Sequence, residues 1–191
     1  SSKGFSFIVK NSISSTLLSE LAPFAKFNSV TFEENSSKVI GMISNENEKL
    51  KEFAKNDHFS TYVYISNNET KSNSCISIQN WEAGNKILGN YFLESNNIGK
   101  FRPLELNYDK LRVSFDKGCY RGQEIVARMK YLGIDRRSFL TFITTSKYDA
   151  NENIKIVGKQ IEIDDKLVFN AIVKKDLIPD IQKYPQVLKI I

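Results

Sequence analysis

The sequence predicts an α+β protein built in two parts, and two observations support this prediction. Residues 4–65 mix strand patterns with helical patterns, and a further helical pattern at 122–131 follows a cysteine flanked by glycines. Beyond Gly133 the helical period stops, and short strand patterns follow one another. We therefore place a boundary between Gly133 and Arg137 and predict two domains, at residues 1–135 and 136–191.

The first part predicts elements in the order β-α-β-β-α-β. Apolar residues that alternate with small or polar ones predict four strands, at residues 4–10, 29–33, 38–44 and 59–65. Apolar residues at helical spacing predict two helices, at residues 12–25 and 46–55. This order is typical of a ferredoxin-like fold.

The segment from 67 to 115 has a less regular pattern. Residues 67–73 are polar and turn-like, and residues 74–81 fit a helix and a strand equally well. Residues 85–107 are rich in glycine and asparagine and predict a long loop, which in a compact domain is often functional. Residues 109–115 predict a short strand or a turn.

The second part predicts strands alone. Five short strand-like runs lie at residues 138–145, 154–157, 160–163, 167–173 and 186–190. Turn-forming residues such as Asp164 and Asp165 separate them, and no helical period is visible. This pattern is typical of a small antiparallel barrel or sandwich.

The richest motif in the chain is Lys117-Gly118-Cys119-Tyr120-Arg121-Gly122-Gln123-Glu124. Because glycine tolerates backbone angles that other residues avoid, Gly118 and Gly122 place Cys119 on a tight turn just before the helix at 122–131. The positive end of a helix favours a thiolate, so we predict that Cys119 reacts faster with alkylating agents than Cys75. The alternative role of Cys119 is that of a small buried hydrophobe.

Positive charge is concentrated around this motif. Residues 100–140 contain ten lysines and arginines and five aspartates and glutamates, and the difference of +5 equals the net charge of the chain. Within the predicted helix, Glu124 precedes Arg128 by four residues, which is the better orientation for an ion pair. An anionic partner is expected near this segment, and a folate polyglutamate tail, a phosphate backbone or an acidic protein would each fit. The alternative is a solvated basic face.

The cysteine motif, with Val126-Ala127-Arg128, Gly133 and Arg137 after it, resembles the signature of the YgfZ family, which has the aminomethyltransferase (glycine-cleavage T-protein) fold. Weaker similarities extend the resemblance over nearly the whole chain, at Gly4-Phe5, 21–30, Glu82-Ala83-Gly84, Phe101, Pro103 and Asn107. The first portion of the family, which precedes the Gly-Phe element, has no counterpart in this sequence.

The resemblance implies a fold and a cofactor. It implies a ferredoxin-like α/β part with a helix at 74–81 that stops at Gly84, followed by a small C-terminal antiparallel β-barrel. It also implies binding of tetrahydrofolate or a derivative, with Glu82 as the anchor of the pterin ring. A carboxylate suits this role because it can accept two hydrogen bonds from an aminopyrimidine edge. An ordinary solvated glutamate at a helix end is the alternative.

The resemblance also assigns roles to the cysteine motif. Cys119 is the expected reactive thiol, with Lys117 and Tyr120 beside it. The remaining motif residues are expected to have structural roles: Gly118, Gly122, Gln123 and Glu124.

The sequence departs from the family pattern close to Glu82. The family often has a tryptophan six residues before this glutamate, as a stacking platform for folate, whereas this chain has Ile76 there. An aliphatic side chain covers a pterin face but lacks aromatic stacking, so the neighbouring Trp81 is the candidate substitute. Arg128, Arg136 and Arg137 are candidates to pair with the glutamate tail of a folate, and ordinary surface charges are the alternative.

Composition excludes several other classes of protein. Two cysteines make neither a disulfide framework nor a metal cage, and His58 has no second ligand at metal-binding spacing, so we expect no metal site. No apolar run is long enough to span a bilayer, and no secretory signal is visible. We expect a cytoplasmic monomer that binds neither a membrane nor nucleic acid directly.

These observations lead to two hypotheses. The first is a folate-binding accessory protein for iron–sulfur enzymes or assembly proteins, which supports cluster assembly or repair and through it tRNA modification. Cys119 would then transfer sulfur, take up a one-carbon unit, or protect or hand over a cluster. The second is a folate-dependent aminomethyltransferase-type enzyme, which would form methylene-folate from an aminomethyl donor. A direct RNA-binding module is disfavoured because residues 100–140 show no motif of interleaved aromatic residues.

Overall fold

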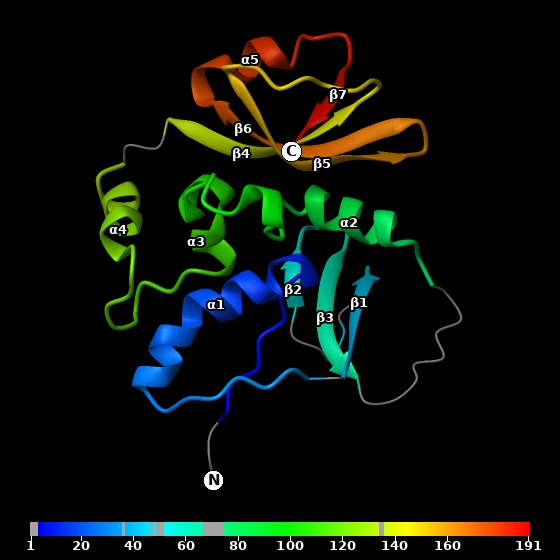
Figure 1. Cartoon of the computed structure of the whole chain (residues 1–191). Coiled ribbons are helices and arrows are strands. Elements are labelled where there is room, and N and C mark those ends of the chain that lie inside the picture. Colours follow the sequence, from blue (N-terminus) through cyan, green and yellow to red (C-terminus); the bar gives the residue numbers. More distant parts are fainter. Residues whose placement is uncertain (1–3, 36, 47, 49–51, 67–74, 134–135) are drawn as a thin grey trace.

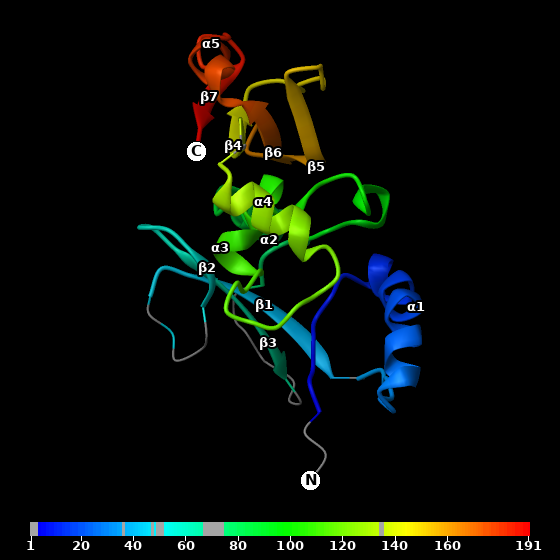
Figure 2. The same cartoon turned by 90° about the vertical axis from the view of Figure 1, so that its left-hand side faces the viewer.

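Two antiparallel sheets lie on either side of a layer of helices (Figures 1 and 2). The computed structural model describes residues 4–35, 37–46, 48, 52–66, 75–133 and 136–191. The first sheet has the order β1-β3-β2, with bounds β1 (Lys38–Ser44), β2 (Glu52–Lys55) and β3 (Ser60–Ser66). The second has the order β5-β6-β4-β7, with bounds β4 (Arg137–Thr144), β5 (Ile154–Ile163), β6 (Lys166–Lys174) and β7 (Val187–Ile190).

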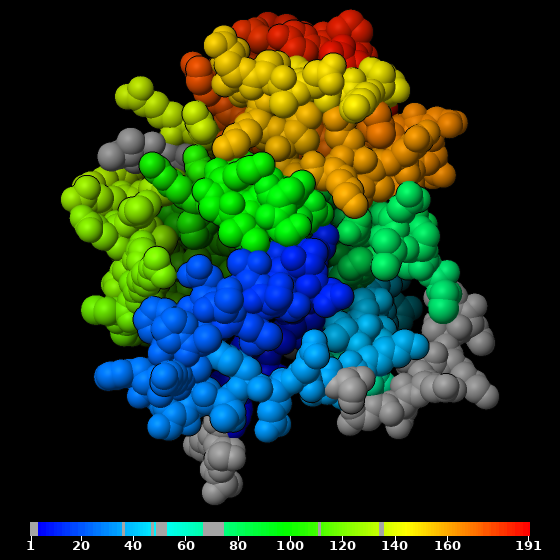
Figure 3. All heavy atoms as spheres, viewed as in Figure 1, coloured from blue at the N-terminus to red at the C-terminus, as the bar shows by residue number. Residues whose placement is uncertain are grey.

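Helices α2, α3 and α4 follow one another across the middle layer, and α1 lies on the outside of the molecule (Figures 1 and 3). The α-helices are α1 (Asn11–Phe27), α2 (Ile78–Ile87), α3 (Tyr108–Leu111), α4 (Gln123–Tyr131) and α5 (Ile178–Ile181). The 3-10 helices are η1 (Ser95–Asn97), η2 (Pro103–Leu106) and η3 (Lys175–Leu177). No helix among the described residues is long and apolar enough to cross a membrane.

The α+β class is confirmed, but the predicted ferredoxin-like order is wrong for the described residues. The predicted helix at 12–25 and the strands at 38–44 and 59–65 correspond to α1, β1 and β3. Residues 4–10 and 29–33 form no strand, although both are described. Alternation alone makes no strand, since the backbone also needs a partner to accept its hydrogen bonds.

Two further local predictions in the first part need correction. The predicted helix at 46–55 contains β2, which pairs with β3 instead, because pairing with an existing strand overrides a short helical pattern. The segment at 109–115 begins in the helix α3, not in a strand. The turn predicted at 67–73 lies outside the described residues.

Helix α2 confirms the predicted helix but shifts it along the chain. It begins after Ser77, whose hydroxyl accepts a hydrogen bond from the backbone N–H of Asn80 at 3.1 Å and so caps the helix. The prediction that the helix stops at Gly84 is wrong, because α2 continues to Ile87. A β-carbon at Gly84 would lie 2.7 Å from Cδ1 of Ile43 in β1, so the glycine permits close packing of α2 on the first sheet.

The C-terminal part is an open four-stranded sheet, not the predicted closed barrel. Its strands agree with the predicted ones, except that 154–157 and 160–163 form the single strand β5 with a register shift between Val157 and Ile161. The predicted turn at Asp164 and Asp165 is confirmed: both residues have positive φ and connect β5 to β6 as a tight hairpin. The short helices η3 and α5 also correct the prediction of strands alone.

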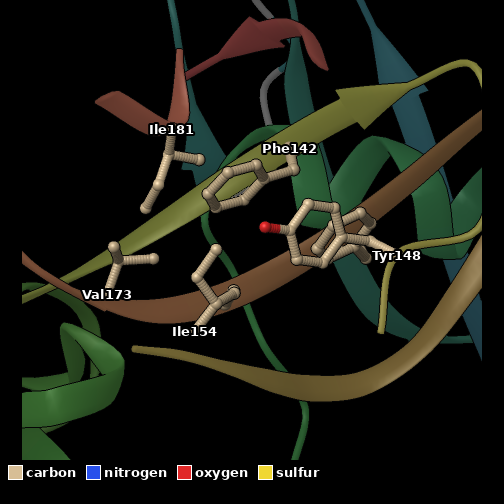
Figure 4. Packing of buried hydrophobic residues seen from close by; sticks show 7 residues of the cluster. Phe142, Tyr148, Ile154, Val173 and Ile181 are labelled. Carbon is tan, nitrogen blue, oxygen red and sulfur yellow. The ribbon is translucent and has the colours of Figure 1, made fainter. Parts of the chain in front are cut away.

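The largest apolar core lies in this C-terminal part (Figure 4). Phe142 of β4 and Phe169 of β6 are fully buried and stack with ring centroids 5.2 Å apart, and Tyr148 and Ile181 close the cluster. A second cluster, around Tyr91 and Val157, joins this sheet to the middle layer.

The end of α2 is fastened to the second sheet by buried polar groups. The backbone carbonyl of Lys86 accepts hydrogen bonds from the hydroxyl of Thr141 in β4 and from Nδ2 of Asn170 in β6. Both side chains are buried, and they add to the hydrogen bond that the backbone N–H of Gly89 donates to the same carbonyl at 2.9 Å. Helix α2 therefore links the two sheets.

Candidate functional site

The first candidate site is a groove where α2 meets β1, which we call the α2 groove. It has a volume of about 320 Å³, at the lower end of the range of small-ligand pockets (about 300–1,000 Å³). Its walls are mainly apolar and come from five separate parts of the chain, at residues 8–10, 39–41, 63, 76–81 and 92. The side chains that matter most here are Val9, Val39, Ile76, Trp81 and Phe92.

The sequence forms this groove through a glycine on the sheet. A β-carbon at Gly41 of β1 would lie 2.9 Å from the indole of Trp81, so only a glycine lets the ring lie this close to the strand. Ile76, half exposed at 49%, precedes the helix and lines the same groove. The structure thus brings together the two side chains that sequence analysis considered as a folate platform.

Glu82 lies beside the α2 groove in a small charged hollow. Its Oε1 is 3.2 Å from Nζ of Lys10, and the same ammonium lies 3.1 Å from Oε1 of Glu94. Lys10 and Phe92 line both the hollow and the groove, so the two spaces adjoin. A carboxylate with one partner on one oxygen still has acceptor sites left for a ligand. Glu82 is therefore part of a charged cluster, with its side chain 32% exposed.

Two lysines in this hollow have pKa values that are shifted in opposite directions. Burial lowers the pKa of Lys86 to about 8, which the negative charges of Glu94 and Glu82 counteract only in part. Burial also opposes the charge of Lys10, but its hydrogen bonds to Glu94 and Glu82 outweigh burial and raise the pKa of this amine above 10.5. Lys10 is thus the fixed positive charge of the hollow, and Lys86 is an amine that titrates near neutral pH.

The cysteine motif forms an exposed turn before α4, as the sequence predicted. Gly122 caps the helix with a φ of 87°, a conformation that favours glycine. The side chain of Gln123 accepts a hydrogen bond from the backbone N–H of Tyr120 at 3.3 Å. Lys117 Nζ lies 4.4 Å from the centroid of the Tyr120 ring, a cation–π contact. Cys119 is exposed, so the alternative of a small buried hydrophobe is wrong.

The turn is held against its surroundings by weak surface contacts. Arg121 Nη1 lies 3.6 Å from Glu20 of α1, with both side chains largely exposed. Within α4 the predicted pair forms, with Arg128 Nη2 2.8 Å from Glu124 Oε1. Gly118 has no atom within 4 Å of the position of an added β-carbon, so no close contact in the described part of the chain requires a glycine there.

Arg128 and Arg137 line a different space, a cleft of about 690 Å³ near the start of the second sheet. None of the residues around the α2 groove lines this cleft. Cys119 lines neither space. The predicted site residues therefore fall at three places: the α2 groove with its hollow, the cysteine turn, and the cleft of the two arginines.

Sequence analysis did not identify several residues in or near these sites. Lys10 pairs with Glu82 and with Glu94, which lie 72 and 84 residues further along the chain, so spacing in the sequence carries no signal of these contacts. Arg112 lies among three aromatic rings, with its guanidinium 4.9 to 5.3 Å from the centroids of Tyr108, Phe92 and Phe53. No group of three or more potential metal ligands (His, Cys, Asp or Glu) occurs among the residues that the structure describes.

Comparison with known proteins bears on this arrangement. No protein-family model matches the chain. An uncharacterised protein of Haemophilus influenzae is 29% identical over 166 residues, which cover 85% of this chain and 58% of that protein. The tRNA-modifying protein YgfZ of Klebsiella pneumoniae is 32% identical over 117 residues, covering 53% of this chain and 36% of that protein.

The protein of the same name from Escherichia coli is 26% identical over 223 aligned positions, which cover 93% of this chain. This chain is thus similar, at 26% to 32% identity, to these YgfZ proteins. The resemblance found in the sequence is thereby confirmed. The matched part spans 36% to 68% of the length of these three relatives, so a whole YgfZ protein contains more than this chain aligns with.

Proposed function

We propose that this chain binds tetrahydrofolate or a derivative in the α2 groove, with the pterin ring between Trp81 and Ile76 and its donor edge toward Glu82. The observation that supports this most directly is that one helix presents an indole to an apolar groove and a carboxylate to the adjoining hollow. Flat heteroaromatic rings bind well in such a site, because the apolar walls cover the ring while few polar groups orient it.

We further propose that the folate-bound chain supports iron–sulfur cluster assembly or repair, and through it tRNA modification. The similarity to proteins named tRNA-modifying protein YgfZ supports the link to tRNA modification. Cys119 is the residue proposed to act on the cluster, because it is an exposed thiol before the N-terminus of α4. The folate supplies one-carbon chemistry when bound, and the residues of this chain hold and orient it.

Calorimetric titration with tetrahydrofolate tests the folate site. Glu82→Gln removes the charge but keeps the shape of the side chain, and Glu94→Gln is the matched control because it removes the other carboxylate that pairs with Lys10. Losing a charge-assisted hydrogen bond costs about 1.5–3 kcal/mol, so we expect at least about tenfold weaker binding for Glu82→Gln alone. Equal affinities of the two variants would contradict the assignment of Glu82.

The accessory role needs a separate experiment. An iron–sulfur enzyme exposed to oxygen would be followed by its cluster absorbance, with and without this chain and tetrahydrofolate. We expect the chain to slow cluster loss, the Cys119→Ser variant to lose this effect, and Cys75→Ser to retain it because Cys75 is exposed but lies outside the motif. Formation of methylene-folate from an aminomethyl donor would instead favour the transferase hypothesis.

A further inference from the structure

The function proposed above does not use the cleft that Arg128 and Arg137 line. This basic cleft, the space of about 690 Å³ lined by Arg128 and Arg137, lies between α4, the segment at 99–105 and the start of the second sheet. Figures 1 and 2 show α4 at the end of the helical layer, below the start of β4. One carboxylate, Glu105, faces six cations that line the cleft: Lys100, Arg102, Arg128, Arg136, Arg137 and Lys155.

Two cations of the basic cleft, Arg128 and Arg136, are weakly engaged by the other described residues. The pair between Arg128 and Glu124 is 2.8 Å long, but the two side chains are 68% and 76% exposed, and surface pairs contribute only about 0–1 kcal/mol. Arg137 Nη1 lies 3.8 Å from Glu105 Oε1, near the limit of an ion pair. The side chain of Arg136 forms no ion pair or hydrogen bond with any of the described residues. An anion that pairs with Arg128 and Arg136 therefore displaces few interactions of the described residues.

The apolar residues of the basic cleft indicate what kind of anion fits. Ile125 and Met129, one turn apart on α4, both line it, and Ile125 is 53% exposed. The single aromatic ring among its lining residues is that of Phe101. Lys155 Nζ lies 4.5 Å from the centroid of this ring, so the ring already makes a cation–π contact with a lysine. Binding of single-stranded nucleic acid relies on open aromatic faces for base stacking, and this cleft lacks them.

We propose that the basic cleft binds an acidic peptide segment of a partner protein, with carboxylates on Arg102, Arg128 and Arg136 and an apolar side chain on Ile125. Arginine suits this role because its planar guanidinium pairs with a carboxylate through two parallel hydrogen bonds. The apolar contact adds a preference for peptides that carry an aliphatic side chain. Charge alone cannot give this preference, since burying aliphatic surface is favourable whatever the charge of the peptide. This inference does not depend on folate binding.

Fluorescence anisotropy with the full chain tests the proposal with three labelled probes. The probes are a peptide of glutamates interrupted by two leucines, an all-glutamate peptide of the same length, and a single-stranded oligouridylate. The cleft variant carries Arg102→Gln, Arg128→Gln and Arg136→Gln. The control variant removes the same charge from exposed positions outside the cleft, through Lys26→Gln, Lys147→Gln and Lys183→Gln. A third variant, Ile125→Ser, removes only the apolar contact.

We expect the leucine-containing peptide to bind more tightly than the all-glutamate peptide, and this preference to disappear in Ile125→Ser. We also expect the cleft variant to bind it about tenfold or more weakly than the parent, with the control variant close to the parent. Equal weakening of both triple variants would show diffuse charge attraction and overturn the proposal. Tighter binding of the oligouridylate, weakened in the cleft variant alone, would replace the peptide by RNA as the partner.

Discussion

Replacing Lys86 by methionine tests whether α2 contains a buried amine whose charge weakens the fold. Lys86 is 7% exposed, and burial lowers the pKa of its amine from 10.5 to about 8. The charged groups that act on this amine are Glu94, Glu82, Lys10 and Lys159. Because the folded state binds this proton less tightly than the unfolded chain, the protonated amine destabilises the fold at neutral pH. This cost falls as the pH rises from the folded toward the unfolded pKa.

The size of the effect follows from these two pKa values. The difference between 10.5 and about 8 corresponds to a cost of about 3 kcal/mol at a pH well below the folded value. Between the two pKa values the unfolded chain keeps this proton while the folded chain releases it, so the cost is about 2 kcal/mol smaller at about pH 9.5 than at about pH 7. Lys86→Met keeps the unbranched stem and removes the titrating group. The variant should therefore be more stable than the parent at neutral pH, by a margin that shrinks by about 2 kcal/mol at the higher pH.

Urea denaturation at both pH values measures this margin. The parent, Lys86→Met and the control Lys147→Met would be compared, since other groups titrate in the same range and only the difference between proteins isolates Lys86. Lys147 is exposed, so its replacement should leave the pH dependence of the parent unchanged. A margin between parent and Lys86→Met that stays the same at both pH values would refute the reasoning.

Three further predictions concern other parts of the chain. Gly41→Val should displace the indole of Trp81 and lower the free energy of unfolding by about 1–3 kcal/mol; because the chain has a single tryptophan, a shifted emission spectrum reports the displacement and an unchanged one contradicts it. Phe142→Ala, at a fully buried ring, should cost about 3–5 kcal/mol in urea denaturation, and a loss below about 1 kcal/mol would mean that the core refills the space. Cys119 should be alkylated faster than Cys75, as followed by peptide mapping; equal rates would show that the helix N-terminus does not activate the thiol.

The fold was predictable from the sequence where a segment has a clear helical or strand pattern and also has a neighbouring element to pack on or pair with. The helix before Leu132 and the strands of the second sheet have clear periodicity, and each has a neighbour on which to pack. Residues 4–10 show the same alternation without a partner strand, and Phe5 is 93% exposed there. Residues 46–55 contain a strand because β3 offers an unpaired edge, which a local pattern cannot reveal.

The candidate sites were predictable only in part, for a related reason. Motif spacing placed Cys119 on a turn before a helix because every residue needed for that turn is close in sequence. It could not show that Glu82 meets Lys10, or that Arg128 and Arg137 share a cleft far from Glu82, because these contacts depend on how distant elements pack.

The carbonyl of Lys86, which Thr141 and Asn170 hold, has a mechanical consequence. The start of α2 forms a wall of the α2 groove, and its end is anchored to β4 and β6. Strand β4 begins at Arg137, on the rim of the basic cleft. A ligand that tilts the end of α2 must therefore either break these two buried hydrogen bonds or move β4 and β6 with the helix. Helix α2 thus connects the wall of the α2 groove to the sheet whose strand β4 lines the basic cleft, although the two spaces share no lining residue.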